Sequence, residues 1–167
     1  EILGPELSLT KLPVREILGT DGLRETGDEA YRLRITPAEI LLQAGTADGL
    51  RCARATLNQL LRLGAVPALD IHDAPRFRHR GVMLDISRDR VPTLASLFEW
   101  VTQLAAWKIN HLQLYIEHTL AYAGHAAVWS GASPITLEEL SALDAYCRAH
   151  GISLNANQNC LGHFERW

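Results

Sequence analysis

Alternating hydrophobic and polar positions mark two short strands in the first half of the chain. Residues 31–35 alternate apolar residues with arginine, which predicts a half-buried β-strand, and residues 39–44 predict a second strand. The turn residues Thr36-Pro37-Ala38 between them favour a hairpin.

A helix and a third strand follow this hairpin. Leucines and alanines recur at helical spacing over residues 50–61, and Gly64 supplies the stop. Residues 66–71 predict one further strand. Together these elements predict a small β-β-α-β domain over residues 1–74, in which residues 1–28 form a Gly- and Pro-punctuated N-terminal extension.

The pattern changes after the junction near residues 73–77. Three nearly continuous apolar segments, 80–86, 110–117 and 152–158, predict strands that are buried on both faces. One helix between them begins after Pro92-Thr93, and a capping box from Thr136 to Glu139 opens the other. The order β-α-β-α-β predicts parallel strands with right-handed crossovers. Three such strands cannot close a (β/α)8 barrel of about 250 residues, so they form a small open sheet or an incomplete barrel.

The middle strand of this set has one polar face. That face carries His111, Gln113, Tyr115 and Glu117, whereas leucine and isoleucine occupy the other face. This pattern indicates a strand that borders a polar lumen, with Glu117 at its C-terminal mouth. Carboxylates at that end of a barrel strand are candidates for catalysis or ligand binding. The alternative for Glu117 is a buried ion pair or a loop cap.

Two other polar groups have weaker patterns. His111, His118 and His125 lie near Glu117, but their loose spacing favours ordinary hydrogen-bonded histidines over a metal site. The charged run 85–90 either holds an anion or a polyol or forms a structural salt-bridge network, and its spacing favours the network.

Composition narrows the class of protein. The 167 residues suit one domain or two small ones, and 47% apolar with 21% charged residues is typical of a soluble globular protein. A net charge of -3 without a basic stripe argues against a nucleic-acid partner, and no apolar run approaches the roughly 20 residues of a membrane span. The missing initiator Met and signal pattern indicate an excised or processed piece, which leaves a cytoplasmic or an exported location open.

The cysteines fit neither a disulfide framework nor a zinc knuckle. They number three and share no close spacing. Cys52 and Cys147 fall within helical patterns and are predicted to be small core residues, whereas Cys160 lies in the terminal loop.

Several segments, taken in order, resemble family 20 glycoside hydrolases, the β-N-acetylhexosaminidases. RGVMLDISR at residues 80–88 resembles the first barrel strand, and the similarity continues through KINHLQLYIE at 108–117 and the Gly162-His163 loop. TLNQLL at 56–61 and IHDAPRF at 71–77 resemble the small α/β domain of the family and its linker into the barrel.

The resemblance implies an α/β protein with two parts. A small α+β domain over residues 1–74 precedes the first three βα units of an incomplete TIM (β/α)8 barrel over residues 75–167. The implied reaction is a substrate-assisted, retaining removal of terminal N-acetylhexosamine from a glycan or glycoconjugate, without cofactor or metal. The acetamido oxygen of the substrate attacks the anomeric carbon, a Glu protonates the leaving oxygen, and an Asp orients the acetamido group.

The resemblance also assigns roles to five residues. Arg88 matches the arginine that holds sugar hydroxyls, and Glu117 with His118 occupies the place of an acidic pair that lines the pocket. His163 matches the histidine that supports the general acid. Asn159 stands where the family usually has an acid that orients this histidine.

The Asp-Glu catalytic pair of the family belongs to a fourth strand, and the chain ends at Trp167 before any such strand. The adjacent Asp28-Glu29 lies outside the predicted barrel and is interpreted as a solvated loop. The resemblance therefore implies that the remainder of the barrel is required and that this chain alone is inactive.

Two other functions are weighed against this one. A non-catalytic carbohydrate-binding or interaction module is disfavoured because part of a barrel exposes strand edges. An unrelated enzyme that uses His163 and Glu117 in metal-assisted chemistry has little support in the sequence. The sugar configuration, the aglycone and the oligomeric state are left open.

Overall fold

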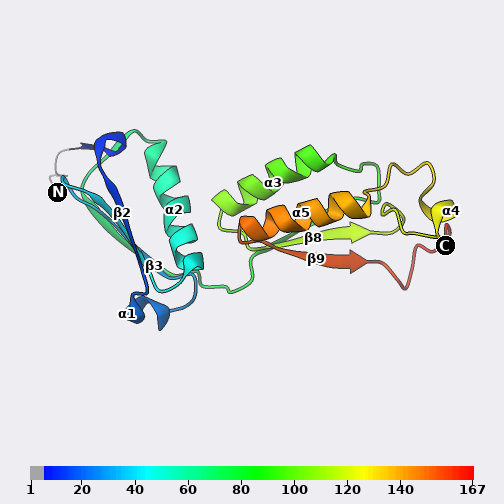
Figure 1. Cartoon of the computed structure of the whole chain (residues 1–167), viewed down its shortest axis with the longest axis horizontal. Helices are drawn as coiled ribbons and strands as arrows, with labels where there is room; N and C mark the ends of the chain where they lie inside the picture. Colours follow the sequence, from blue (N-terminus) through cyan, green and yellow to red (C-terminus); the bar gives the residue numbers. More distant parts are fainter. Residues whose placement is uncertain (1–5) are drawn as a thin grey trace. The chain divides into compact units, whose positions relative to one another are not determined.

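The computed structural model describes residues 6–167, which form two compact α/β units. The first unit ends at Arg78 and the second begins at His79 (Figure 1). Within the described residues, none of the helices combines the length and the apolar character needed to cross a membrane.

A four-stranded sheet forms the centre of the first unit. Its strands, in spatial order, are β2 (Val14–Leu18), β4 (Ile40–Ala44), β3 (Tyr31–Ile35) and β6 (Leu69–Asp73). The hairpin prediction is confirmed, because β3 and β4 pair in antiparallel fashion. The helix α2 (Ala47–Leu61) packs on this sheet, and the hydroxyl of its N-cap Thr46 accepts a hydrogen bond from Gly49 N at 3.1 Å.

The prediction that residues 1–28 are an extension is wrong over the described part of that segment. It contains β1 (Leu7–Ser8), the short 3-10 helix η1 (Leu9–Lys11), β2 and the one-turn helix α1 (Asp21–Arg24). Strand β2 was not predicted from the sequence because it is an edge strand with polar residues. Its pairing is parallel to β4, and its Arg15 and Glu16 form ion pairs with Glu39 and Arg54.

The single strand predicted at residues 66–71 is two strands. The first, β5 (Ala65–Val66), pairs with β1, whereas β6 pairs with β3. Pro67 lies between them, and a proline without an N–H interrupts a strand ladder.

The second unit contains a three-stranded parallel sheet in the order β7 (Gly81–Asp85), β8 (His111–Ile116) and β9 (Ser153–Gln158). The predicted parallel arrangement is confirmed. Two helices connect the strands, α3 (Leu94–Ala106) and α5 (Leu137–Ala149), and the short α4 (Ala126–Trp129) precedes α5. The predicted capping box of α5 is present: Thr136 and Glu139 exchange hydrogen bonds of 2.9 and 3.1 Å.

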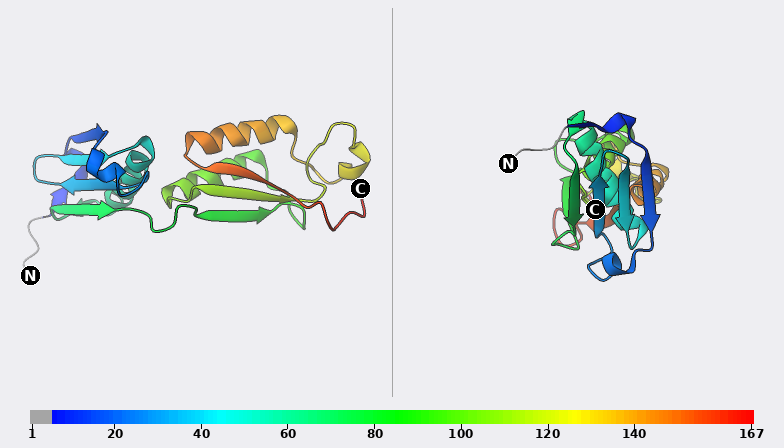
Figure 2. Two further views of the ribbon diagram at one scale, coloured as in Figure 1. Left: turned by 90° about the horizontal axis from the view of Figure 1, so that it is seen from below. Right: turned by 90° about the vertical axis from the view of Figure 1, so that its left-hand side faces the viewer.

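Helices cover only one face of this sheet, as Figures 1 and 2 show. Leu112, Leu114 and Ile116 of β8 are buried in the core beneath α3 and α5. The prediction of strands buried on both faces is therefore wrong, most clearly at β7, where Met83 is 56% exposed. The uncovered face is mainly polar, because alternate residues of β8 and β9 are His, Gln, Tyr, Ser and Asn.

The three thiols behave as the sequence predicts. Cys52 and Cys147 are buried, and Cys160 is exposed. Burial raises the pKa of the Cys147 thiol to about 11, and the nearby Asp144 contributes in the same direction.

Gly49 offers a test of the packing between α2 and its sheet. A Cβ at this position would contact the Ala30 carbonyl oxygen and would lie 2.8 Å from the Ala44 Cβ. We expect Gly49→Ala to lower the free energy of unfolding by about 1–3 kcal/mol in urea denaturation, despite the better helix propensity of alanine.

Gly22→Ala is the matched control, because a Cβ there has nothing within 4 Å. Its effect should stay within about 0.5 kcal/mol. Equal effects of the two substitutions would contradict the packing described for Gly49.

Candidate functional site

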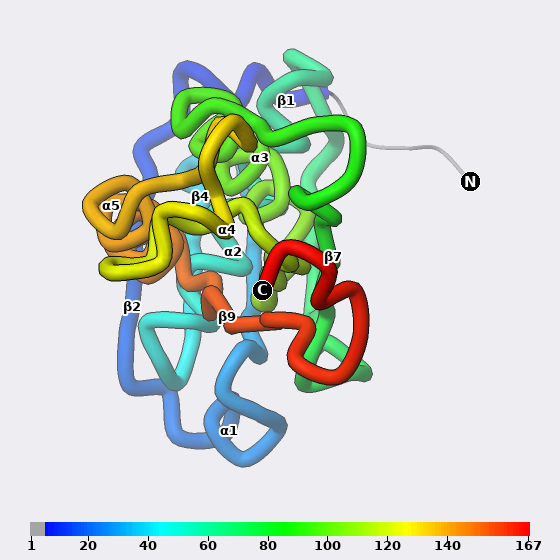
Figure 3. The backbone as a smooth tube through the Cα atoms, turned by 90° about the vertical axis from the view of Figure 1, so that its right-hand side faces the viewer, coloured from blue at the N-terminus to red at the C-terminus, as the bar shows by residue number. Residues whose placement is uncertain are grey.

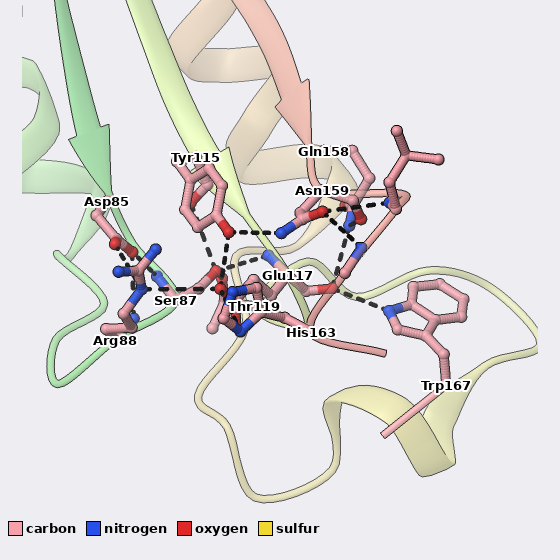
Figure 4. A network of polar contacts seen from close by, with 12 residues as sticks. Asp85, Ser87, Arg88, Tyr115, Glu117, Thr119, Gln158, Asn159, His163 and Trp167 are labelled. Atoms are coloured by element: carbon pink, nitrogen blue, oxygen red, sulfur yellow. Dashed lines mark hydrogen bonds and ion pairs between the residues drawn. The ribbon is translucent and has the colours of Figure 1, made fainter. Parts of the chain in front are cut away.

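A network of polar side chains lies where the three parallel strands end (Figure 4). Segments from all three strands contribute to it. Its labelled members are Asp85, Ser87 and Arg88 at and after β7, Tyr115, Glu117 and Thr119 at and after β8, and Gln158, Asn159, His163 and Trp167 at and after β9. The carboxyl ends of parallel strands are the usual place for sites in α/β proteins.

The backbone of Glu117 is fixed on both sides. Its N–H donates to Ser87 Oγ at 2.7 Å, and this oxygen lies 3.1 Å from Thr119 Oγ1. Its carbonyl oxygen accepts from Gln158 Nε2 at 3.1 Å and from Trp167 Nε1 at 3.0 Å. The segment after β9, which loops beyond the sheet in Figure 3, is thereby attached to the end of β8.

Glu117 is only 8% exposed, and its carboxylate has three side-chain neighbours. Its Oε1 accepts from the Tyr115 hydroxyl at 2.8 Å, and it lies 3.7 Å from Arg88 Nε and 3.8 Å from His163 Nδ1. A buried carboxylate needs such partners because losing water disfavours its charged form.

Arg88 is held but remains accessible. Its Nε lies 3.0 Å from Asp85 Oδ2, and its guanidinium lies 5.1 Å from the centre of the Tyr115 ring. Contact with Tyr115, followed by the charges of Asp85 and Glu117, raises the pKa of Arg88 above its ordinary value. The side chain is nevertheless 59% exposed, so the charged run contains a salt bridge and still presents a cation to a ligand.

Asn159 shapes the loop that carries His163. Its Oδ1 accepts from the backbone N–H groups of Leu161 and Gly162 at 3.3 and 3.2 Å, and its Nδ2 donates to the Tyr115 hydroxyl at 2.7 Å. The resemblance implied that the residue at this position orients the imidazole directly. Here Asn159 holds the loop instead, and the charged group near the imidazole is Glu117.

The other histidines near Glu117 in the sequence are not among the labelled members of this network. His118 is part-buried and does not join the network. His111 is the first residue of β8. Its Nδ1 lies 3.0 Å from Asn155 Nδ2, and its Nε2 lies 3.1 Å from Gln113 Nε2. His125 packs against Trp167 with ring centroids 5.4 Å apart. Among residues 6–167, no three His, Cys, Asp or Glu side chains converge as a metal-binding group.

Several members of the network were not predicted as site residues from the sequence: Ser87, Tyr115, Thr119, Gln158 and Trp167. Alternation on β8 placed Tyr115 on the polar face, which was a usable signal. Nothing in the local sequence indicated that Gln158 and Trp167 donate to the same carbonyl oxygen, because that contact depends on the path of the loop.

Comparison with known proteins gives one family-model match and several relatives. Residues 6–74 match the model described as glycosyl hydrolase family 20, domain 2. A β-hexosaminidase of Akkermansia muciniphila is 30% identical over 187 residues, covering 95% of this chain and 38% of that protein. A β-N-acetylhexosaminidase of Cellulomonas fimi is 36% identical over 104 residues, covering 59% of this chain and 21% of that protein.

Solved structures agree with these relatives. A crystal structure of a β-N-acetylhexosaminidase superposes with a TM-score of 0.79 at 28% identity, covering 91% of this chain and 36% of that chain. A mutant Streptomyces plicatus β-hexosaminidase in complex with product, GlcNAc, shares the fold with a TM-score of 0.72 at 24% identity, covering 86% and 33%. The chain thus spans less than two fifths of the length of these proteins.

Ser87 tests how firmly the network holds Glu117. Ser87→Ala leaves the buried N–H of Glu117 without its 2.7 Å acceptor, so we expect the free energy of unfolding to fall by about 1–3 kcal/mol. Urea denaturation measures the loss.

Ser141→Ala serves as the control, because the Ser141 hydroxyl only donates to the Leu137 carbonyl within an exposed helix turn. Its effect should be within about 0.5 kcal/mol. A Ser87→Ala variant as stable as this control would show that Ser87 does not hold Glu117.

Proposed function

Because this chain belongs to glycoside hydrolase family 20, we propose that it is the amino-terminal portion of a longer β-N-acetylhexosaminidase. Residues 1–74 would be its small domain, and residues 75–167 the first three βα units of a TIM barrel. Three findings support this proposal. The chain spans less than two fifths of its relatives, the three-stranded sheet has β7 and β9 at its edges, and the face without helices is polar.

The proposed reaction is the substrate-assisted, retaining removal of terminal N-acetylhexosamine residues. The observation that carries this proposal is the convergence of Arg88, Glu117 and His163 at the carboxyl ends of parallel strands. These groups suit the hydroxyl-rich end of a sugar, because they combine forked donors with a carboxylate acceptor.

Arg88 and the acidic end of β8 bind the sugar in this scheme. Asp85 and Glu117 contact Arg88 Nε, so its terminal amino groups can donate to vicinal hydroxyls. Oε1 of Glu117 receives the protein donors, and its second oxygen would accept from the substrate. His118, the next residue, would line the same pocket.

His163 and Asn159 support the general acid. The imidazole lies 3.8 Å from Glu117 and is 61% exposed, so it can hydrogen-bond a group supplied by a later strand. Asn159 holds the loop that presents it. The catalytic Asp-Glu pair would come from the rest of the longer protein.

The adjacent Asp28-Glu29 does not substitute for that pair. It lies in the first unit, where Glu29 Oε1 is 3.5 Å from Arg51 Nη2 and 3.8 Å from Cys52 Sγ. These contacts are structural ones between α2 and the segment before β3.

The 167-residue chain alone should not hydrolyse an aryl N-acetylglucosaminide. Release of the aryl group, measured beside a blank without protein, checks this expectation. Hydrolysis faster than in the blank, by an activity that copurifies with the chain, would contradict the assignment of the catalytic pair to a later strand.

In the longer protein, Arg88→Ala should lower kcat/KM for the same substrate by about tenfold or more, because a charge-assisted contact to the sugar is lost. Arg148→Ala is the matched control, since Arg148 forms its ion pair with Asp144 on α5, on the helix side of the sheet. An Arg88→Ala enzyme with the kcat/KM of the Arg148→Ala enzyme would remove Arg88 from the sugar site.

A further inference from the structure

The hydroxyl of Tyr115 joins two segments of the site through hydrogen bonds of known direction. It lies 2.7 Å from Asn159 Nδ2 and 2.8 Å from Glu117 Oε1. A phenol has one proton to donate and lone pairs with which to accept. Since the Glu117 carboxylate can only accept, the Tyr115 proton points to Glu117 and its oxygen accepts from Asn159.

The orientation of the Asn159 amide is fixed independently. Its Oδ1 accepts from two backbone N–H groups, those of Leu161 and Gly162. The NH2 group must therefore face the other way, toward Tyr115. The sequence of donors and acceptors thus runs in one direction, from the loop after β9 through Tyr115 to Glu117 at the end of β8.

This direction allows one carboxylate, not two. With a carboxylate at position 159 as well as at Glu117, two acceptors would compete for the single Tyr115 proton, and one of them would lose its donor. In this chain, where Tyr115 lies between the two positions, an amide at position 159 leaves the tyrosine proton to the acid at position 117.

We propose that Tyr115 is a positioning residue that makes Glu117 and Asn159 a matched acceptor–donor pair. The acid of the site is placed at the end of β8, and the amide after β9 is its complement. This accounts for Asn159, which stands where an acid was expected. The same tyrosine ring lies beneath Arg88, so one side chain keeps Arg88, Glu117 and the His163 loop in register.

The inference deepens the proposed function and rests on it for its catalytic meaning. Its structural content can be tested without activity. Hydrogen–deuterium exchange of residues 159–167 in the 167-residue chain reports directly on the loop that Asn159 holds.

Asn159→Asp should speed exchange in residues 159–167 by about tenfold, the factor that one charge-assisted hydrogen bond supplies. Adding Glu117→Gln should return it toward the rate of the unmodified chain. In that double variant both hydrogen bonds of the Tyr115 hydroxyl are kept, but their direction is reversed. The new amide at position 117 donates to the Tyr115 hydroxyl. The hydroxyl then donates to the new carboxylate at position 159. Exchange of α5 and of residues 31–35 should not change in either variant, which shows that both units remain folded.

Tyr115→Phe tests the same contacts without adding a charge. It should also speed exchange of residues 159–167, whereas Tyr146→Phe, which removes a hydroxyl bonded to Thr102 at 2.9 Å, should not. The proposal is overturned if Asn159→Asp and Tyr115→Phe leave the loop unchanged, or if the double variant exchanges as fast as Asn159→Asp alone.

The activity of the longer protein separates this proposal from the proposed function. If the longer protein is active but exchange of residues 159–167 is the same in Asn159→Asp, the double variant and Tyr115→Phe, the matched pair is refuted and the hydrolase proposal stands. If the double variant restores slow exchange but the longer protein has no hydrolase activity, the matched pair stands and the hydrolase proposal is refuted.

Discussion

The structure of the second unit depends on satisfying one buried carboxylate, that of Glu117. A carboxylate removed from water is costly unless donors and positive charge replace the lost solvent. Here a phenol, an arginine and a histidine surround it, and its backbone N–H and carbonyl are bonded as well. These partners lie at the ends of the three strands or just after them, so the contacts of one side chain and its backbone connect the ends of the sheet.

The one-sided packing of the sheet explains why the site lies open to a ligand. The helices α3 and α5 bury the leucine face of β8, and the opposite face keeps its polar residues. In an isolated sheet such a face is exposed to solvent. In the proposed barrel it would line the interior, and Arg88, Glu117 and His163 would form one part of the rim of a pocket that later strands complete.

Much of the fold was predictable because its signals are local. The hairpin of β3 and β4, the capping box at Thr136 and the order of parallel strands all follow from patterns within a few residues. Strand β2 was not predictable, because its polar residues are stabilised by ion pairs with Glu39 and Arg54, which are distant in sequence. The break between β5 and β6 could have been predicted from Pro67, because proline has no N–H for a strand ladder, but the sequence was interpreted as one strand. The site was predictable only in part. Arg88, Glu117, Asn159 and His163 were expected from the sequence, but the contact of Asn159 with Tyr115 appears only in the folded loop.

A crystal structure of the proposed longer protein with N-acetylglucosamine bound would show whether Arg88 and Glu117 hold the sugar. We expect sugar hydroxyls within hydrogen-bond distance of the Arg88 guanidinium and the Glu117 carboxylate, with Tyr115 still between Glu117 and Asn159. A sugar bound at the carboxyl ends of the strands without contact to either Arg88 or Glu117, or bound elsewhere on the protein, would contradict it.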